Sequence, residues 1–195
     1  MELIKKFGRE NRRFIFMDGE FADLTSNGVK LLSIALIADN GQKLYLELNY
    51  REDDCSPWVK RNVIPFLRAN KVSKFKAVEM INKFVRDNYG DEQPVLVADV
   101  NQFDWLAIKY LYDTHADEIP EAYRGDYSTD IPFFYIPLDL STLLWTRGLD
   151  IDCSREGLAK ELGMKVDLLH QHYALDDAEV VKFIFVKLID YIIII

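Results

Sequence analysis

The segment that most constrains the fold of this chain is an apolar run that ends in two acidic residues. Residues 14–17 are all apolar, and Asp18, Gly19 and Glu20 follow them. The run predicts a buried β-strand over 14–18, and side chains two apart on a strand point to the same face. Asp18 and Glu20 are therefore aimed at one point. Such a pair predicts either a divalent cation, which removes the repulsion between the carboxylates, or a strand that ends in solvated acids.

A third acidic residue, Asp104, begins the apolar stripe of a predicted helix. Helical spacing places Ala107, Ile108 and Leu111 on the same face as Asp104. A carboxylate that points into a core is usually paired with a base or bound to a metal, and this face carries no Lys or Arg. The alternative interpretation is an acid near a helix N-terminus that accepts hydrogen bonds from backbone N–H groups.

The last predicted helix repeats this pattern. Asp177 shares its face with Val181, Ile184 and Leu188, so it is expected to point inward. The same two interpretations, a metal ligand or an acid bound to backbone N–H groups, apply to Asp177.

His172 lies five residues before Asp177. A neutral imidazole, with an ordinary pKa of about 6.5, accepts a proton from water near neutral pH. We therefore expect His172 to serve as a general base. His170 and His115 are expected to be surface or core residues without a catalytic role.

Three motifs in this order resemble those of the DEDDh branch of the 3′→5′ exonucleases. This family includes the proofreading epsilon subunit of bacterial polymerase, RNase T and oligoribonuclease. Each motif alone is weak, but their order and their spacing over most of the chain make the resemblance specific. In chain order the motifs are Asp18-Gly19-Glu20, Gln102-Phe103-Asp104 and the stretch from His172 to Asp177.

The second motif departs from the family pattern. The family usually has an Asn four residues before the motif Asp, and this chain has Val100 there, with Asn101 one position closer. Asp99 stands where a His is common. The contacts of the usual Asn are therefore in question, whereas the role of Asp104 is not.

The third motif has two possible alignments. Tyr173 and Asp177 have the spacing of the sister DEDDy branch, in which a tyrosine replaces the histidine. The Ala and Leu that follow Tyr173 favour the assignment to His172.

The resemblance implies an α/β fold of RNase H-like type, with a mixed sheet of three antiparallel strands and then parallel strands, flanked by helices. It also implies a phosphodiesterase that uses two Mg²⁺ or Mn²⁺ ions to release nucleoside 5′-monophosphates from single-stranded 3′ ends of RNA or DNA. Asp18 would bridge the ions, Glu20 and Asp177 would hold one, Asp104 would support the other, and His172 would deprotonate the attacking water. A polymerase proofreading exonuclease and a catalytically inactive nucleic-acid-binding or scaffold domain are the alternatives.

Substrate contacts are predicted for three further residues. Phe21 and Phe103 could stack on terminal bases, as aromatic residues do in single-strand binders, although core packing is the alternative for Phe103. Asn101 would take over contacts of the usual Asn.

The net charge of −8 argues against a long nucleic-acid groove, because affinity for phosphates comes largely from Lys and Arg. The substrate would be held locally. Lys71, Lys74 and Lys76 are candidates, and a solvated face is the alternative for this cluster.

A single domain over 1–195 is expected, because 195 residues with 49% hydrophobic content suffice for one core. Residues 113–132 are predicted to form a loop insertion, and Asp139 and Ser154 to cap two short helices. The predicted strands are 14–18, 31–37, 43–48, 95–98 and 133–136, and the longer helices are 58–68, interrupted at Pro65, and 74–88.

Cys55 and Cys153 have no metal-binding spacing and indicate reduced thiols in a cytoplasmic setting. No signal peptide or membrane-spanning segment is visible. The apolar run 191–195 is too short to span a bilayer, because Lys187 and Asp190 interrupt the apolar sequence before it. We expect this end to be buried or to face a second copy of the chain in a homodimer, and an aggregation-prone tail is the alternative.

Overall fold

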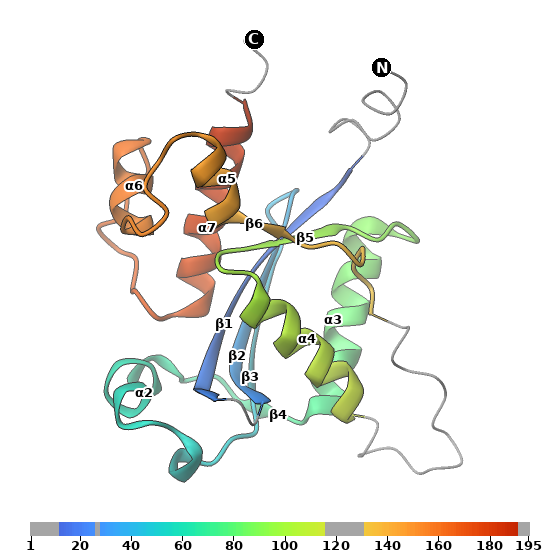
Figure 1. The fold of residues 1–195 in the computed structure, drawn as a ribbon. Coiled ribbons are helices and arrows are strands. Elements are labelled where there is room, and N and C mark those ends of the chain that lie inside the picture. The colour runs from blue at the N-terminus through green and yellow to red at the C-terminus, as the bar shows by residue number, and fades with distance from the viewer. Residues whose placement is uncertain (1–11, 26–27, 116–130, 191–195) are drawn as a thin grey trace.

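The structure, a computed structural model, describes residues 12–25, 28–115 and 131–190. Within these residues one mixed sheet has the strand order β4-β3-β2-β1-β5-β6 (Figure 1). The first three strands are antiparallel neighbours, and each of the others runs parallel to its neighbour. The RNase H-like α/β prediction is therefore confirmed. The strands are β1 (Phe14–Thr25), β2 (Gly28–Ala38), β3 (Lys43–Leu48), β4 (Lys71–Val72), β5 (Val95–Ala98) and β6 (Leu138–Asp139).

Helices cover both faces of the sheet (Figure 1). One face packs against α3 (Lys74–Tyr89) and α4 (Gln102–His115), and the other packs against α7 (Ala174–Asp190), with α5 (Leu140–Thr146) and α6 (Arg155–Glu161) beside it. A smaller hydrophobic cluster packs α2 (Pro57–Asn62) against Ala22 of β1 and Leu32 of β2.

Alternation along β1 decides which face carries the acids. Ile15 and Met17 are fully buried in the core cluster that includes α3 and α4, whereas Phe16 is buried with α7 and meets Phe185 edge-on at 5.5 Å between ring centroids. Because side chains alternate across a strand, Asp18 continues the Phe16 face and points toward the N-terminal end of α7.

Two predicted elements have different bounds from those expected. The strand predicted over 14–18 continues to Thr25, because its hairpin with β2 runs on past the acids through register shifts at Glu20/Phe21 and Phe21/Leu24. The helix predicted over 58–68 ends at Asn62 and is followed by a 3₁₀ turn at Ile64–Phe66 that contains Pro65. The prediction that Pro65 interrupts this helix is confirmed.

The strand predicted over 133–136 is wrong. The strand that joins the sheet is β6, and residues 133–136 before it are irregular. Pro132 and Pro137 bound this segment, and the side chain of Tyr135 within it is 72% exposed. A proline lacks the N–H that a sheet ladder needs, which explains the displacement. β6 is short because Asp139 already caps α5, as predicted, by accepting a hydrogen bond from the backbone N–H of Thr142. The cap predicted for Ser154 is also confirmed at α6.

Several predictions lie wholly or partly outside the described residues. Residues 113–115 of the predicted insertion belong to α4, and 116–130 are not described. The run 191–195 is also outside, and so is the side chain of His115. None of the helices in the described residues is long and apolar enough to cross a membrane.

Candidate active site

The middle of β1 and the carboxyl end of β5 border a cavity of about 390 Å³ beside the N-terminus of α7. Asp18 from β1 lines it, together with His172 and Asp177. The lining also includes Asp99, which is the residue after β5, and Arg155, which is the first residue of α6. Residues far apart in the sequence thus meet at one edge of the sheet.

Glu20, His172 and Asp177 form the tightest group at this edge. One ligand atom from each lies within 4.8 Å of the others, a separation that suits a shared metal ion. Asp18 and Asp104 are not members of this group. The structure therefore brings three of the five predicted catalytic residues within reach of one cation and places Asp18 beside them in the cavity.

The first turn of α7 holds the histidine segment through its acids. Oδ2 of Asp177 accepts a hydrogen bond from the backbone N–H of His172 at 2.8 Å, and Oδ2 of Asp176 accepts one from the N–H of His170 at 2.8 Å. The interpretation of Asp177 as an acid bound to backbone N–H groups is thus correct, and Asp177 also belongs to the possible metal-binding group.

The carboxylate of Asp104 approaches β1 at Gly19, the residue between Asp18 and Glu20. A Cβ atom placed on Gly19 would lie 3.2 Å from Oδ1 of Asp104 and 3.0 Å from Cδ1 of Leu31. The missing side chain of Gly19 therefore allows the carboxylate to approach the strand. Asp104 is 4% exposed, and its Oδ1 is buried without a hydrogen-bond partner in the described part of the chain. A buried oxygen of this kind needs a ligand or a proton.

Each of the four carboxyl groups has a pKa above its ordinary value. Burial is the main cause at each one, and it raises the pKa of Glu20 to about 8 and that of Asp177 to about 7. The pKa of Asp18 and that of Asp104 are also raised by burial, with further contributions from neighbouring carboxylates. Among the described residues, no Lys or Arg forms an ion pair with any of the four. The donor set fits a divalent cation, since oxygen ligands and uncompensated negative charge are what Mg²⁺ and Mn²⁺ require.

His172 is held in a specific conformation. Its backbone φ is 65°, which is uncommon outside glycine, and its ring meets the edge of Trp58 from α2 at 4.8 Å between centroids. Burial lowers the pKa of His172 below its usual value, so the imidazole is neutral at physiological pH. A neutral ring beside the acids is able to accept a proton.

Tyr173 points away from this cluster of acids toward β3. Its ring packs against that of Tyr45 at 5.0 Å, and the hydroxyl of Tyr45 donates to Oε1 of Glu47 at 3.0 Å. Glu47 is buried and also accepts the backbone N–H groups of Arg68 and Ala69. These contacts suit a packing role for Tyr173.

The predicted substrate residues lie around the acids rather than in the 390 Å³ cavity, whose described lining includes none of them. Cζ of Phe21 would be 3.2 Å from a Cβ on Gly19, so Phe21 lies beside Asp104. Phe103 is half-buried on α4, and Asn101 uses its backbone N–H to bind Oδ1 of Asp139 at 3.2 Å. The cavity is lined instead by Val100, which stands where the family usually has Asn.

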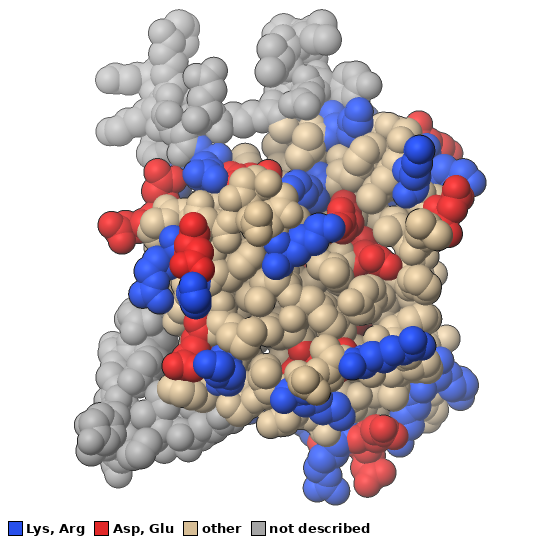
Figure 2. Space-filling view, turned by 180° about the vertical axis from the view of Figure 1, so that it is seen from behind, with Lys and Arg blue, Asp and Glu red and all other residues tan. Residues whose placement is uncertain are grey.

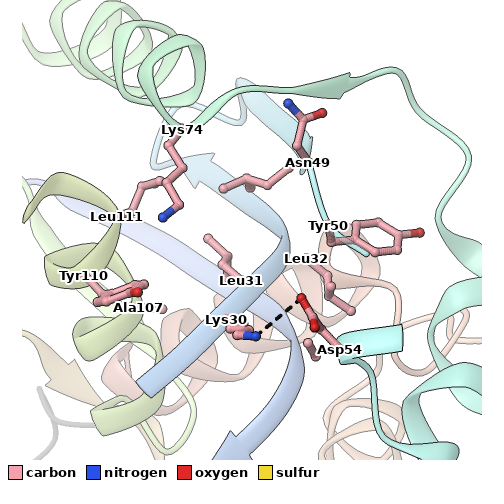
Figure 3. Close-up of a pocket in the computed structure, with 12 residues that line it drawn as sticks. Lys30, Leu31, Leu32, Asn49, Tyr50, Asp54, Lys74, Ala107, Tyr110 and Leu111 are labelled. Carbon is pink, nitrogen blue, oxygen red and sulfur yellow. Dashed lines mark ion pairs between the residues drawn. The ribbon is translucent and has the colours of Figure 1, made fainter. Parts of the chain in front are cut away.

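A second cavity, of about 160 Å³, lies on the α4 side of the sheet (Figure 3). Leu31 and Leu32 lie at its centre, with Ala107, Tyr110 and Leu111 from α4 on one side and Asn49 and Tyr50 on the other. Lys30 is paired with Asp54 at 3.4 Å, and the ammonium group of Lys74 lies 5.2 Å from the centre of the Tyr110 ring. Apolar walls with two lysines nearby suit a base and its phosphate.

Basic side chains do not form one continuous track on the face seen in Figure 2, where Lys and Arg stand apart with Asp and Glu among them. The expectation that nucleic acid is held locally stays a prediction.

Sequence reasoning missed Trp58 and Arg155. No motif marks either one, because Trp58 reads as part of an amphipathic helix and Arg155 as the first residue after a helix cap. The only sequence signal for Arg155 was an acid, Asp99, at a motif position where a histidine is common.

No protein-family model and no curated protein matches the chain. Solved structures share its fold. Two structures of exonuclease I, one of them the zinc-bound form of an E. coli ExoI–ssDNA complex, are 14% identical and have TM-scores of 0.62 and 0.60. In each case the match covers 93% of this chain but only 41% of the other.

Two further structures are similar. A 3′-exonuclease that recognises the histone mRNA stem-loop is 10% identical with a TM-score of 0.64, covering 97% of this chain and 69% of its own. The RNase domain of yeast Pop2 is 10% identical with a TM-score of 0.60, covering 98% and 81%. At these identities the likeness shows the fold of the chain.

Proposed function

We propose that this chain is a divalent-metal-dependent 3′→5′ exonuclease of the DEDDh type, which releases nucleoside 5′-monophosphates from single-stranded 3′ ends of RNA or DNA. One observation carries the proposal: ligand atoms of Glu20, His172 and Asp177 lie within 4.8 Å of one another, and Asp18 lines a cavity together with His172 and Asp177. The shared fold with exonuclease I, a 3′-exonuclease and the Pop2 RNase domain supports a nuclease.

Asp18, Glu20, Asp104 and Asp177 would hold two Mg²⁺ or Mn²⁺ ions. The buried Oδ1 of Asp104, which has no partner among the described residues, and the raised pKa values of all four groups support this assignment. When bound, the ions would stabilise the charge on the entering and leaving oxygens during displacement at phosphorus.

The protein itself supplies the base and its orientation. The neutral imidazole of His172 would take one proton from the attacking water and later release it to solvent. The hydrogen bond from its backbone N–H to Asp177 and the edge contact with Trp58 restrict where the ring can lie. A base that is already positioned loses little entropy when the substrate binds.

Substrate binding is assigned to the side of the acids next to α4. Phe21 lies beside Asp104, and Asn101 and Phe103 precede Asp104 in the sequence, so we propose that these three residues contact the terminal nucleotides. The second cavity, with Lys30 and Lys74, is the place where a preceding base would fit. One structural neighbour was solved with single-stranded DNA and another concerns recognition of a histone mRNA stem-loop, so both nucleic acids are substrates to test.

The test is a digest of matched RNA and DNA oligonucleotides labelled at the 5′ end, with Mg²⁺, Mn²⁺ or EDTA. We expect progressive shortening of the labelled strand with either metal and none in EDTA. Strand binding without shortening would favour the catalytically inactive alternative. Cleavage of a circular single strand would show an endonuclease and contradict the proposal.

A further inference from the structure

Asp99 is a fifth acid at the edge of the site. It follows β5 directly and lines the 390 Å³ cavity together with Asp18, His172 and Asp177. Its negative charge contributes to the raised pKa of Asp18 and to that of Asp104. A carboxylate in this place could turn toward a cation bound by the other acids, unless something holds it.

Arg155 holds both oxygens of Asp99. Its Nε donates to Oδ2 at 2.8 Å and its Nη2 to Oδ1 at 3.1 Å, which is the two-pronged geometry of a strong ion pair. Oδ1 also accepts the hydroxyl of Ser141 at 2.8 Å. The side chains of Arg155 and Asp99 are only 17% and 20% exposed. The carboxylate is thus fixed from two sides.

The other donors of Arg155 are used as well. Nη2 donates to Oγ of Ser141 at 2.9 Å and to the carbonyl of Ile151 at 2.8 Å, and Nη1 donates to the carbonyl of Cys153 at 2.6 Å. The guanidinium group therefore does not reach out to a substrate phosphate. It ties β5, α5 and the 151–155 segment together along the cavity wall.

We propose that Arg155 is a positioning residue that withholds Asp99 from the metal ions of the active site. Its ion pair keeps the fifth carboxylate neutralised and turned away, so that only the four acids of the motifs bind metal. This inference rests on the proposed function, because it assumes a metal site at those acids. A simple structural role for the ion pair would stabilise α6 on the sheet without any effect on metal binding.

The experiment is calorimetric titration of Mn²⁺ into the full chain and its variants at a fixed pH, with thermal melts to establish folding. In Arg155→Met, the freed Asp99 is expected to raise Mn²⁺ affinity by roughly tenfold or to add a binding equivalent, since an unneutralised carboxylate lies near the ions. Nuclease kcat at saturating Mn²⁺ should fall at the same time. The double variant Asp99→Asn with Arg155→Met should restore the parental affinity and stoichiometry.

Two controls separate this role from others. Arg147→Met removes an equal charge from a residue outside the cavity that donates to the carbonyl of Leu188, and it should leave Mn²⁺ binding unchanged. Asp99→Asn alone leaves the charge of Arg155 uncompensated beside the acids, so it should weaken Mn²⁺ binding, the direction opposite to that of Arg155→Met. Because this single variant keeps Arg155, it tests the proposal even if Arg155→Met fails to fold.

Parental Mn²⁺ binding in folded Arg155→Met or in Asp99→Asn would overturn the inference, and so would weaker than parental binding in the double variant. Parental binding in either single variant would leave the ion pair with a structural role, and weaker binding in the double variant would make Asp99 a ligand. Both would leave the proposed nuclease function standing. Absence of Mn²⁺ binding by the parental chain would overturn the function and the inference together.

Discussion

The backbone N–H of His172 donates to Oδ2 of Asp177 over 2.8 Å, so the proposed base and a proposed metal ligand are fixed to each other. The bond uses the backbone of His172 and leaves its ring free to act. It also explains why residue 172 adopts its left-handed conformation, with φ of 65°, at the entrance to α7.

We predict that His172→Ala lowers the cleavage rate by roughly 10²–10⁴-fold while Mn²⁺ binding is retained, because a general base contributes about this much. Tyr173→Phe should lose far less, since the Tyr173 ring packs against Tyr45 away from the acids. Single-turnover rates and calorimetry measure the two effects. Lost Mn²⁺ binding in His172→Ala would make the histidine a ligand, and a larger loss in Tyr173→Phe would favour the DEDDy assignment.

The raised carboxyl pKa values predict how stability changes with pH in the absence of metal. Glu20, at about 8, and Asp177, at about 7, keep their protons in the folded state over a range in which the unfolded chain has lost them. Their stabilising contribution is therefore complete below about pH 4 and is lost as the pH rises toward 8.

In EDTA, the melting temperature of Glu20→Gln should fall less between pH 6 and pH 9 than that of the parental chain. The exposed Glu79, which pairs with Lys76, provides the matched control Glu79→Gln, which should keep the parental slope. Excess Mn²⁺ should reverse the parental loss, because the metal binds the ionised acids. If the melting temperature of Glu20→Gln fell between pH 6 and pH 9 as much as that of the parental chain, the raised pKa of Glu20 would be contradicted.

Gly19→Ala should weaken Mn²⁺ binding. The new Cβ would lie 3.2 Å from Oδ1 of Asp104, so the carboxylate would have to move away from the other acids. Gly157→Ala in α6 is the matched control, because its Cβ would meet only Ser154 at 3.4 Å and alanine favours a helix. Calorimetry should show reduced affinity in the first variant only. Equal affinities would mean that Asp104 does not contribute to the metal site.

Val100→Asn should stabilise the protein. Val100 has φ of 52°, a conformation that is strained for a β-branched residue and easier for Asn. Relief of about 1 kcal/mol of strain would raise the melting temperature by about 2–4 °C. Val186→Asn, on an exposed part of α7, should leave it nearly unchanged because Val and Asn have similar helix propensities. A lower melting temperature in Val100→Asn would rule out strain at this position.

The fold was predictable where local patterns decide it. The strand that begins at Phe14, the strand over 43–48 and the caps at Asp139 and Ser154 are local properties, and each was found in the structure. The prediction of a strand at 133–136 was wrong because it rested on apolar composition alone. The prolines on both sides and the exposure of the segment place the strand pairing at β6 instead.

The site was predictable in its acids but not in its supporting residues. Asp104 and Asp177 stand out because an acid on an apolar face is unusual, and the structure places Asp104 in the core and Asp177 in the metal-binding group. The partnership of Asp99 with Arg155 spans 56 residues, and Trp58 and His172 are about twice as far apart in the sequence. Pairings of this kind depend on tertiary structure, and no local pattern in the chain reports them.

The most direct test of the central claim is calorimetric titration of Mn²⁺ into the parental chain, Asp18→Ala and Asp177→Ala, with the 5′-labelled digest run on the same preparations. We expect the parental chain to bind two ions and shorten the strand from its 3′ end. Both variants should lose nuclease activity and metal binding while they stay folded. Unchanged Mn²⁺ binding in both folded variants would contradict the claim that these carboxylates form a metal-dependent active site.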